Sequence, residues 1–90
     1  MNKSLSLFKN SYNEGIRIPL SYAGFTWLPE IVINQKITDI SSVVGSGIWT
    51  FGFLASAQIF GFKGILMHSM IYGAGGALHA FYLLAENKNM

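Results

Sequence analysis

The chain has no cysteine, only two prolines and very few charged residues. Without cysteine it can form no disulfide and offers no thiolate to a metal ion. Lys, Arg, Asp and Glu make up 11% of its 90 residues, whereas an ordinary soluble domain has about a quarter. The six basic residues are spread over the chain and form no patch, so we expect no nucleic-acid partner.

Charge is absent from two long stretches, Ile40 to Phe62 and Gly64 to Ala85, which are separated by Lys63 alone. About 20 apolar residues, at about 1.5 Å of helical rise each, cross the hydrocarbon core of a bilayer. The sequence therefore predicts an all-α membrane protein. Its two transmembrane helices, over residues 38–61 and 64–86, form a hairpin closed by a glycine-containing turn.

The remaining segments are polar or mixed in character. Residues 1–15 are predicted to be a polar N-terminal arm that orders against a partner, and residues 87–90 a polar tail. Residues 16–37 alternate between apolar and polar side chains at first and are then interrupted by Pro29 and Glu30. A proline and a carboxylate are costly in lipid, so we expect a short interfacial amphipathic segment, with Glu30 as a turn residue. The aromatic anchors expected at the membrane interface are Tyr22 and Trp27.

Basic residues are distributed unevenly about the two predicted spans. Lys63 lies in the turn between them, and the other five basic residues lie on the side of the termini. Because Lys and Arg favour the cytoplasmic side, we predict that both termini are cytoplasmic or in the equivalent compartment of an organelle.

Small residues are concentrated in both predicted spans, where they let helix backbones approach closely in lipid. One stripe from each span is sufficient to close the hairpin. The second span has small residues on more than one face, in the run YGAGGA, which indicates further contacts with other subunits or with a bulky ligand. The predicted packing residues are Gly45, Gly52 and Ser56 in the first span and Ser69, Gly73, Gly76 and Ala80 in the second.

The second span also holds both histidines, and His68, Tyr72, Gly75 and His79 share one helix face at 4-3-4 spacing. An ionisable residue inside a membrane indicates a functional site, and several uses remain open. Each imidazole can hydrogen-bond a carbonyl, hydroxyl or carboxylate on a neighbouring helix. Each can instead be an axial ligand of chlorophyll or haem, because Gly64 and Gly75 lie one turn before them and leave room for a flat ring.

Two further uses of the same histidines remain open. Met67, His68 and Met70 are soft donors that suit a copper ion, although the two methionines point to different sides of His68. Proton or quinone traffic past the His–Tyr face is the last alternative.

The sequence has no phosphate-binding glycine loop, no paired carboxylates in the spans and no nucleophile beside a base. We therefore expect no catalysis by this chain alone. The predicted function is that of a small accessory subunit in a larger integral membrane complex of the energy-transducing or redox metalloenzyme type. Its partners are other integral membrane subunits and bound lipids. The alternatives are a subunit that carries chlorophyll or haem on His68 and His79, and a small self-assembling pore such as a phage holin.

Overall fold

The computed structural model describes residues 2–88, and every regular element within them is helical, which confirms the predicted all-α class. The predicted tail at 87–90 is described only for its first two residues, which belong to the last helix; residues 89 and 90 lie outside the described part. In chain order the elements are α1 (Asn2–Ser11), the π-helical turn η1 (Tyr12–Ile16), α2 (Arg17–Ala23), α3 (Trp27–Pro29), the π-helical turn η2 (Glu30–Asn34), α4 (Ile40–Phe60) and α5 (Phe62–Lys88).

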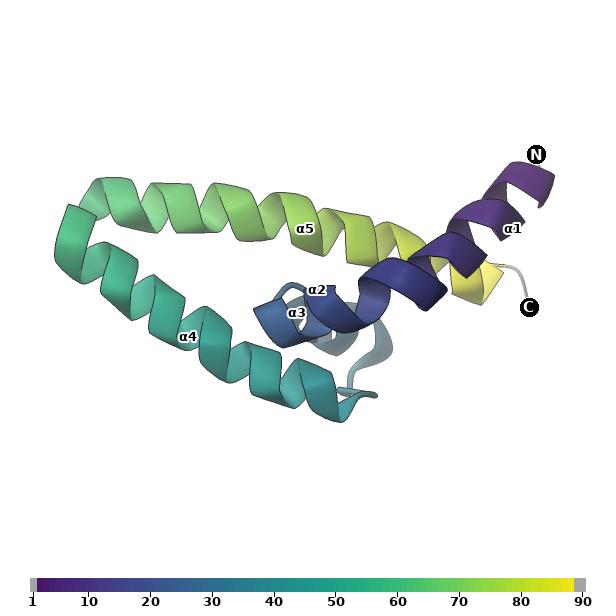
Figure 1. Cartoon of the computed structure of the whole chain (residues 1–90), viewed down its shortest axis with the longest axis horizontal. Coiled ribbons are helices and arrows are strands. Elements are labelled where there is room, and N and C mark those ends of the chain that lie inside the picture. Colours follow the sequence, from purple (N-terminus) through teal and green to yellow (C-terminus); the bar gives the residue numbers. More distant parts are fainter. Residues whose placement is uncertain (1, 89–90) are drawn as a thin grey trace.

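The two longest helices, α4 and α5, form a helical hairpin that turns at Gly61 (Figure 1). Gly61 has a φ of +66°, in the left-handed region that glycine enters without a steric penalty. Just beyond the turn, a Cβ on Gly64 would lie 2.0 Å from the carbonyl oxygen of Ser56, so this close contact requires glycine. Farther from the turn the two helices diverge (Figure 1).

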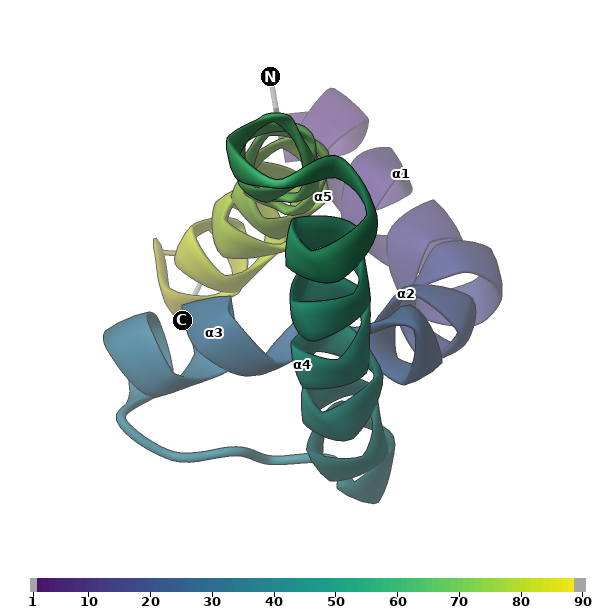
Figure 2. The same cartoon turned by 90° about the vertical axis from the view of Figure 1, so that its left-hand side faces the viewer.

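The N-terminal helices occupy the open end of this hairpin, as two views at right angles show (Figures 1 and 2). α2 crosses α4 where Gly24 meets Gly45, and a Cβ on Gly45 would lie only 1.8 Å from the carbonyl oxygen of Ser21. α1 lies beside the C-terminal part of α5, with the rings of Phe8 and Phe81 5.1 Å apart. The first and last described residues are at the same end of the molecule.

Two N-terminal segments differ from what the sequence alone indicates. Residues 2–15 are helical, and α5 of the same chain is the surface against which they order. The alternation near the start of segment 16–37 is typical of an extended strand, yet Arg17–Ala23 is an α-helix. Its polar Ser21 is fully buried and its Ile18 is 57% exposed, so α2 is amphipathic with the polar side facing inward.

Polar residues occupy the interior of the described chain, and apolar residues cover its exterior. The apolar residues that are buried are Tyr12, Tyr82, Leu83 and Ala85, whereas the buried polar ones are Ser21, Thr26, Glu30, Ser41, Ser42, His68 and His79. Large apolar side chains such as Phe51 and Met70 are more than 70% exposed on α4 and α5. Water-soluble domains have the reverse arrangement.

Among the helices of residues 2–88, only α4 is both long and apolar enough to cross a membrane, and only 6% of its apolar stretch is buried. α5 is longer, but its polar side chains, including His68 and His79, make it less apolar than α4. The prediction of two spans is therefore not confirmed, and the structure provides one candidate span. The compartment of the termini stays a prediction.

Candidate functional site

The histidine face of α5 points into the chain, toward the N-terminal helices and α4. Each of its four residues has contacts of its own. His68 meets α4, the Tyr72 hydroxyl donates to the carbonyl oxygen of Ala23 at 2.7 Å, Gly75 lies under the Phe25 ring, and His79 reaches Tyr12 and Glu30. The face therefore contains two separate polar sites, one around each histidine.

His79 is fully buried and has a partner on each ring nitrogen. Its Nδ1 lies 2.5 Å from the Tyr12 hydroxyl oxygen, and its Nε2 lies 3.3 Å from Glu30 Oε2. An ionised carboxylate only accepts hydrogen bonds, so Nε2 carries a proton and donates it. Burial raises the pKa of Tyr12, which keeps its hydroxyl protonated and able to donate to Nδ1. A neutral imidazole thus satisfies both neighbours.

Glu30 is the buried charge of this network, with a fully covered side chain. Its Oε1 accepts the backbone N–H of Thr38 at 3.1 Å, and its Oε2 lies 4.0 Å from the guanidinium of Arg17. Burial acts to raise the pKa of Glu30, but hydrogen bonds from His79 and from the Thr38 amide outweigh it and lower the pKa below its ordinary value. The carboxylate is therefore ionised at neutral pH, with each oxygen close to a donor or a cation.

Arg17 connects this buried site to the molecular surface. Its Nη2 donates to Asp39 Oδ2 at 2.8 Å, its Nη1 donates to Asn13 Oδ1 at 3.1 Å, and its guanidinium lies 5.6 Å from the centre of the Tyr82 ring. Burial alone lowers the pKa of Arg17, but the neighbouring Asp39 and Tyr82 outweigh it and raise the pKa. One cation therefore lies between the carboxylates of Asp39 and Glu30 and links η1, η2 and the start of α4.

A hydroxyl cluster next to this network fixes the crossing of α2 and α4. Thr26 Oγ1 lies 3.1 Å from Ser21 Oγ and 2.6 Å from Ser42 Oγ, and all three residues are fully buried. These hydroxyls satisfy one another, which is the requirement for polar groups removed from water.

His68 occupies an aromatic enclosure nearer the hairpin turn. Its Nε2 donates to the carbonyl oxygen of Trp49 at 3.0 Å, and its ring stacks on Tyr72 at 4.5 Å and lies edge-on to Trp49 and Phe53. A Cβ on Gly52 would be in ordinary contact, 3.6 Å from the imidazole. His68 Nδ1 is buried without a hydrogen-bond partner in the described chain.

The glycines expected to leave room for a macrocycle are in contact with other parts of the chain. The space beside Gly64 is filled by the backbone of Ser56, and a Cβ on Gly75 would lie 2.1 Å from the Phe25 ring. Axial ligation by His79 would displace the Tyr12 or Glu30 hydrogen bond. Binding of chlorophyll or haem therefore stays a prediction that requires a different local conformation.

The soft donors proposed for copper do not converge in this conformation. Met67 and Met70 are 51% and 72% exposed, whereas His68 is buried, so the methionines lie outside the aromatic enclosure.

The two predicted interface anchors differ from each other in their surroundings. Tyr22 is 49% exposed, and Trp27 packs edge-on against Trp49 with ring centres 5.3 Å apart.

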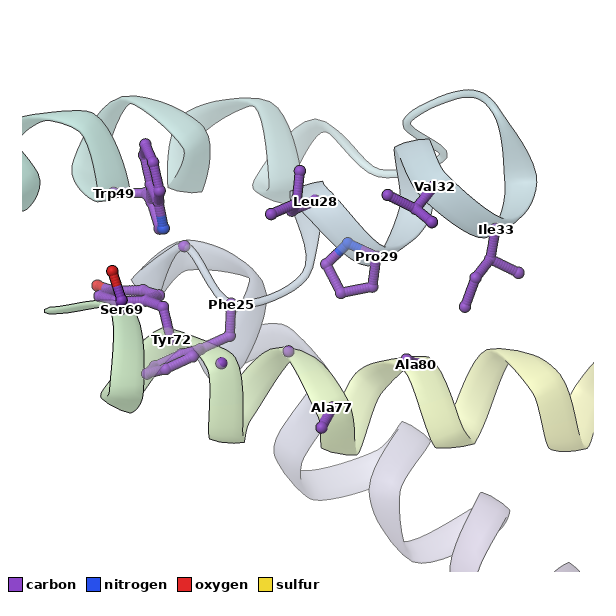
Figure 3. A pocket seen from close by; sticks show the side chains of 13 residues that line it. Phe25, Leu28, Pro29, Val32, Ile33, Trp49, Ser69, Tyr72, Ala77 and Ala80 are labelled. Carbon is purple, nitrogen blue, oxygen red and sulfur yellow. The ribbon is translucent and has the colours of Figure 1, made fainter. Parts of the chain in front are cut away.

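An apolar groove of about 410 Å³ runs along α5 on the side of α3 and η2 (Figure 3). Its floor is the predicted small-residue stripe of α5, Ser69, Gly73, Gly76 and Ala80, together with Ala77. The stripe on α4 is used differently: Gly45, Gly52 and Ser56 pack on Gly24, His68 and Gly64. One of the two predicted stripes thus closes the fold and the other lines a groove. The opposite wall of the groove comes from Phe25, Leu28, Pro29, Val32, Ile33 and Trp49.

The predicted site did not include Tyr12, Arg17 and Asp39. Glu30 was predicted to be a turn residue. The signal available was weak: Arg17 and Glu30 are the only charged residues of the segment between Gly15 and Lys36. A buried histidine in a helix without charges needs a polar partner, and an isolated acid in an apolar segment is a candidate for that partner.

Comparison with known proteins found no matching family model, no matching curated protein and no matching solved structure.

The lowered pKa of Glu30 predicts a pH-dependent stability. In the unfolded state the pKa of a glutamate side chain is about 4.3. A carboxyl group whose pKa is lower than this in the folded state contributes its full stabilisation at pH values above about 4.3. This contribution is lost as the pH falls through the folded pKa. Unfolding in detergent should therefore show that the stability difference between the protein and Glu30→Gln is largest near pH 7 and shrinks below about pH 4.3. A difference that stays constant down to pH 3 would contradict this assignment, and Glu14→Gln, at an exposed carboxylate, controls for the lost charge.

Proposed function

We propose that this chain is a small accessory subunit of a larger integral membrane complex, which it enters as a two-span helical hairpin. The observation that carries the proposal is the polar interior beneath an apolar exterior. Glu30 and His79 are fully buried, and Phe51, Met70 and Phe81 are more than half exposed. An apolar solvent stabilises such an arrangement and water does not.

α5 is the second span in this proposal, although its composition is less apolar than that of α4. Its two histidines are covered by the N-terminal helices and by α4, so they do not contact lipid. The side chains that α5 presents outward include Leu66, Ile71 and Leu84, each more than 45% exposed. Mean composition counts buried and outward residues equally, whereas lipid contacts only the outward ones.

A structural role is favoured because the ionisable groups of the site are already used within the chain. Tyr12, Glu30 and His79 are almost completely buried and bonded to one another, so none of them faces an open cavity. The network links η1 and η2 to α5. We expect the complex to be an energy-transducing or redox metalloenzyme assembly, in which small helical subunits of this kind are common.

An outward glycine on α4 indicates where a partner helix packs. Gly47 is exposed, and a Cβ there would have no neighbour within 4 Å, so the fold of this chain does not use it. In membranes, glycine on a helix surface permits close approach of another helix.

The test is native electrophoresis after extraction in mild detergent, with mass spectrometry of the proteins that migrate with the chain. We expect fixed stoichiometry with larger integral membrane proteins, and a several-fold loss of this association in Gly47→Leu with the chain itself still folded. Homo-oligomers alone would support the pore instead. A Soret or chlorophyll absorption band in the purified chain would support the cofactor carrier, and a chain recovered as a free monomer would refute the accessory role.

A further inference from the structure

The groove beside α5 has the volume of a binding site for a hydrocarbon chain. We infer that it binds one acyl chain of an anionic phospholipid; this inference rests on the proposed membrane location. The groove volume is about 410 Å³, and a methylene group takes about as much space as a water molecule, roughly 30 Å³. The groove therefore accommodates about 14 methylene groups, most of one acyl chain.

The position of the groove in the proposed membrane frame matches one leaflet. Lys63 marks one boundary, and Arg17, Asp39 and Tyr82 mark the other. From Lys63 to Tyr82 the rise along α5 is about 29 Å, close to the thickness of the hydrocarbon core. The groove floor, Ser69 to Ala80, extends about 16 Å, from near the midplane to just below the charged boundary.

The volume of the groove favours an acyl chain over a helix. The groove narrows at Gly76, where a Cβ would be in ordinary contact, 3.5 Å from Pro29, and it is open beside Gly73, where a Cβ would meet nothing within 4 Å. An α-helix with side chains is about 10–12 Å wide, so a length of about 16 Å occupies on the order of 1,500 Å³, several times the groove volume of about 410 Å³. The lining is almost wholly apolar, and the hydroxyl of Tyr72 is already bonded to the carbonyl oxygen of Ala23.

An exposed cation near the Ile33 wall of the groove favours an anionic headgroup. Lys36 follows Ile33, a wall residue, by three positions, so their Cα atoms are at most about 11 Å apart. Lys36 is exposed and forms no ion pair with the part of the chain that the structure describes. An ammonium group at this level of the membrane attracts the phosphate of an anionic lipid.

Native mass spectrometry of the purified full-length chain tests the inference. The chain is exposed to mixed micelles that contain phosphatidylglycerol and phosphatidylcholine in equal amounts, and the retained lipid is then identified by its mass. We expect one lipid per chain, with phosphatidylglycerol favoured. Gly73→Leu should reduce retention at least tenfold, because its side chain enters the open groove, where a Cβ on Gly73 meets nothing within 4 Å. Gly47→Leu, the same change at another unobstructed glycine, should retain the lipid.

Lys36→Gln separates the headgroup contact from the acyl contact. This variant should still retain one lipid. Its preference for phosphatidylglycerol over phosphatidylcholine should fall about fivefold, which is the effect of one surface cation. Lys63→Gln, at the other end of the hairpin, should keep the preference. Retention that is unchanged in Gly73→Leu, or no retained lipid at all, would overturn the inference. If the chain still migrates with membrane partners in that case, the accessory role stands and only the lipid site fails.

Discussion

Gly45→Leu is expected to destabilise the fold by on the order of 3 kcal/mol or more, because the new side chain would overlap backbone atoms rather than a flexible side chain. A Cβ at this position lies 1.8 Å from the carbonyl oxygen of Ser21 and 2.9 Å from Gly24. Relief of this overlap requires α2 to separate from α4, which also breaks the hydroxyl cluster of Ser21, Thr26 and Ser42.

The same helix supplies the matched control for this prediction. Gly47→Leu introduces the same side chain two residues away, where a Cβ meets nothing within 4 Å. Replacement of an unobstructed helical glycine removes a helix-propensity penalty of about 1 kcal/mol, so this variant should be neutral or slightly stabilised in isolation. Denaturation of both variants in detergent micelles distinguishes them, and equal stabilities would show that the α2–α4 crossing is not as close as described.

His79→Ala is expected to cost on the order of 3–5 kcal/mol of stability, because it leaves two buried hydrogen-bonding groups, one of them charged, without a partner. The Glu30 carboxylate would lose its imidazole donor, and the buried Tyr12 hydroxyl would lose its acceptor. We expect the N-terminal helices to detach from α5, with weaker incorporation into the proposed complex.

His68→Ala is the natural comparison for that experiment. His68 donates one hydrogen bond, to the Trp49 carbonyl oxygen, and forms no ion pair with any residue that the structure describes. Its removal should therefore cost clearly less than removal of His79, about 2 kcal/mol for a lost hydrogen bond and lost packing. Protease accessibility of residues 2–16 provides a second readout, because only His79→Ala should expose α1 and η1. Equal costs for the two variants would contradict the assigned network.

The sequence was informative where a property is local. Long uncharged runs located α4 and α5 to within two residues of their observed ends, and 4-3-4 spacing identified the helix face of His68 and His79. Small residues marked both the packed stripe of α4 and the groove of α5, although spacing alone could not tell which stripe serves which purpose.

The sequence was uninformative where the role of a residue depends on a distant partner. Arg17 and Glu30 were predicted to be interfacial because no residue close to them in the sequence neutralises both charges. Their environment in the structure exists only once α4 and α5 surround them. The alternation at residues 16–22 indicated an extended segment because the local sequence does not contain the surface against which α2 packs. In the folded chain the polar side of α2 faces inward, which inverts the usual rule for an amphipathic helix.

The hydrogen bond between Tyr12 and His79 also constrains how the chain is made. The two residues are 67 positions apart, so at roughly 5–20 residues per second a ribosome adds the second about 3–13 s after the first. During that interval Tyr12 and Glu30 have no imidazole partner, and in the proposed membrane setting water at the membrane surface is their natural environment. Under that proposal the N-terminal helices stay outside the hydrocarbon core until the last helix is made and binds the first.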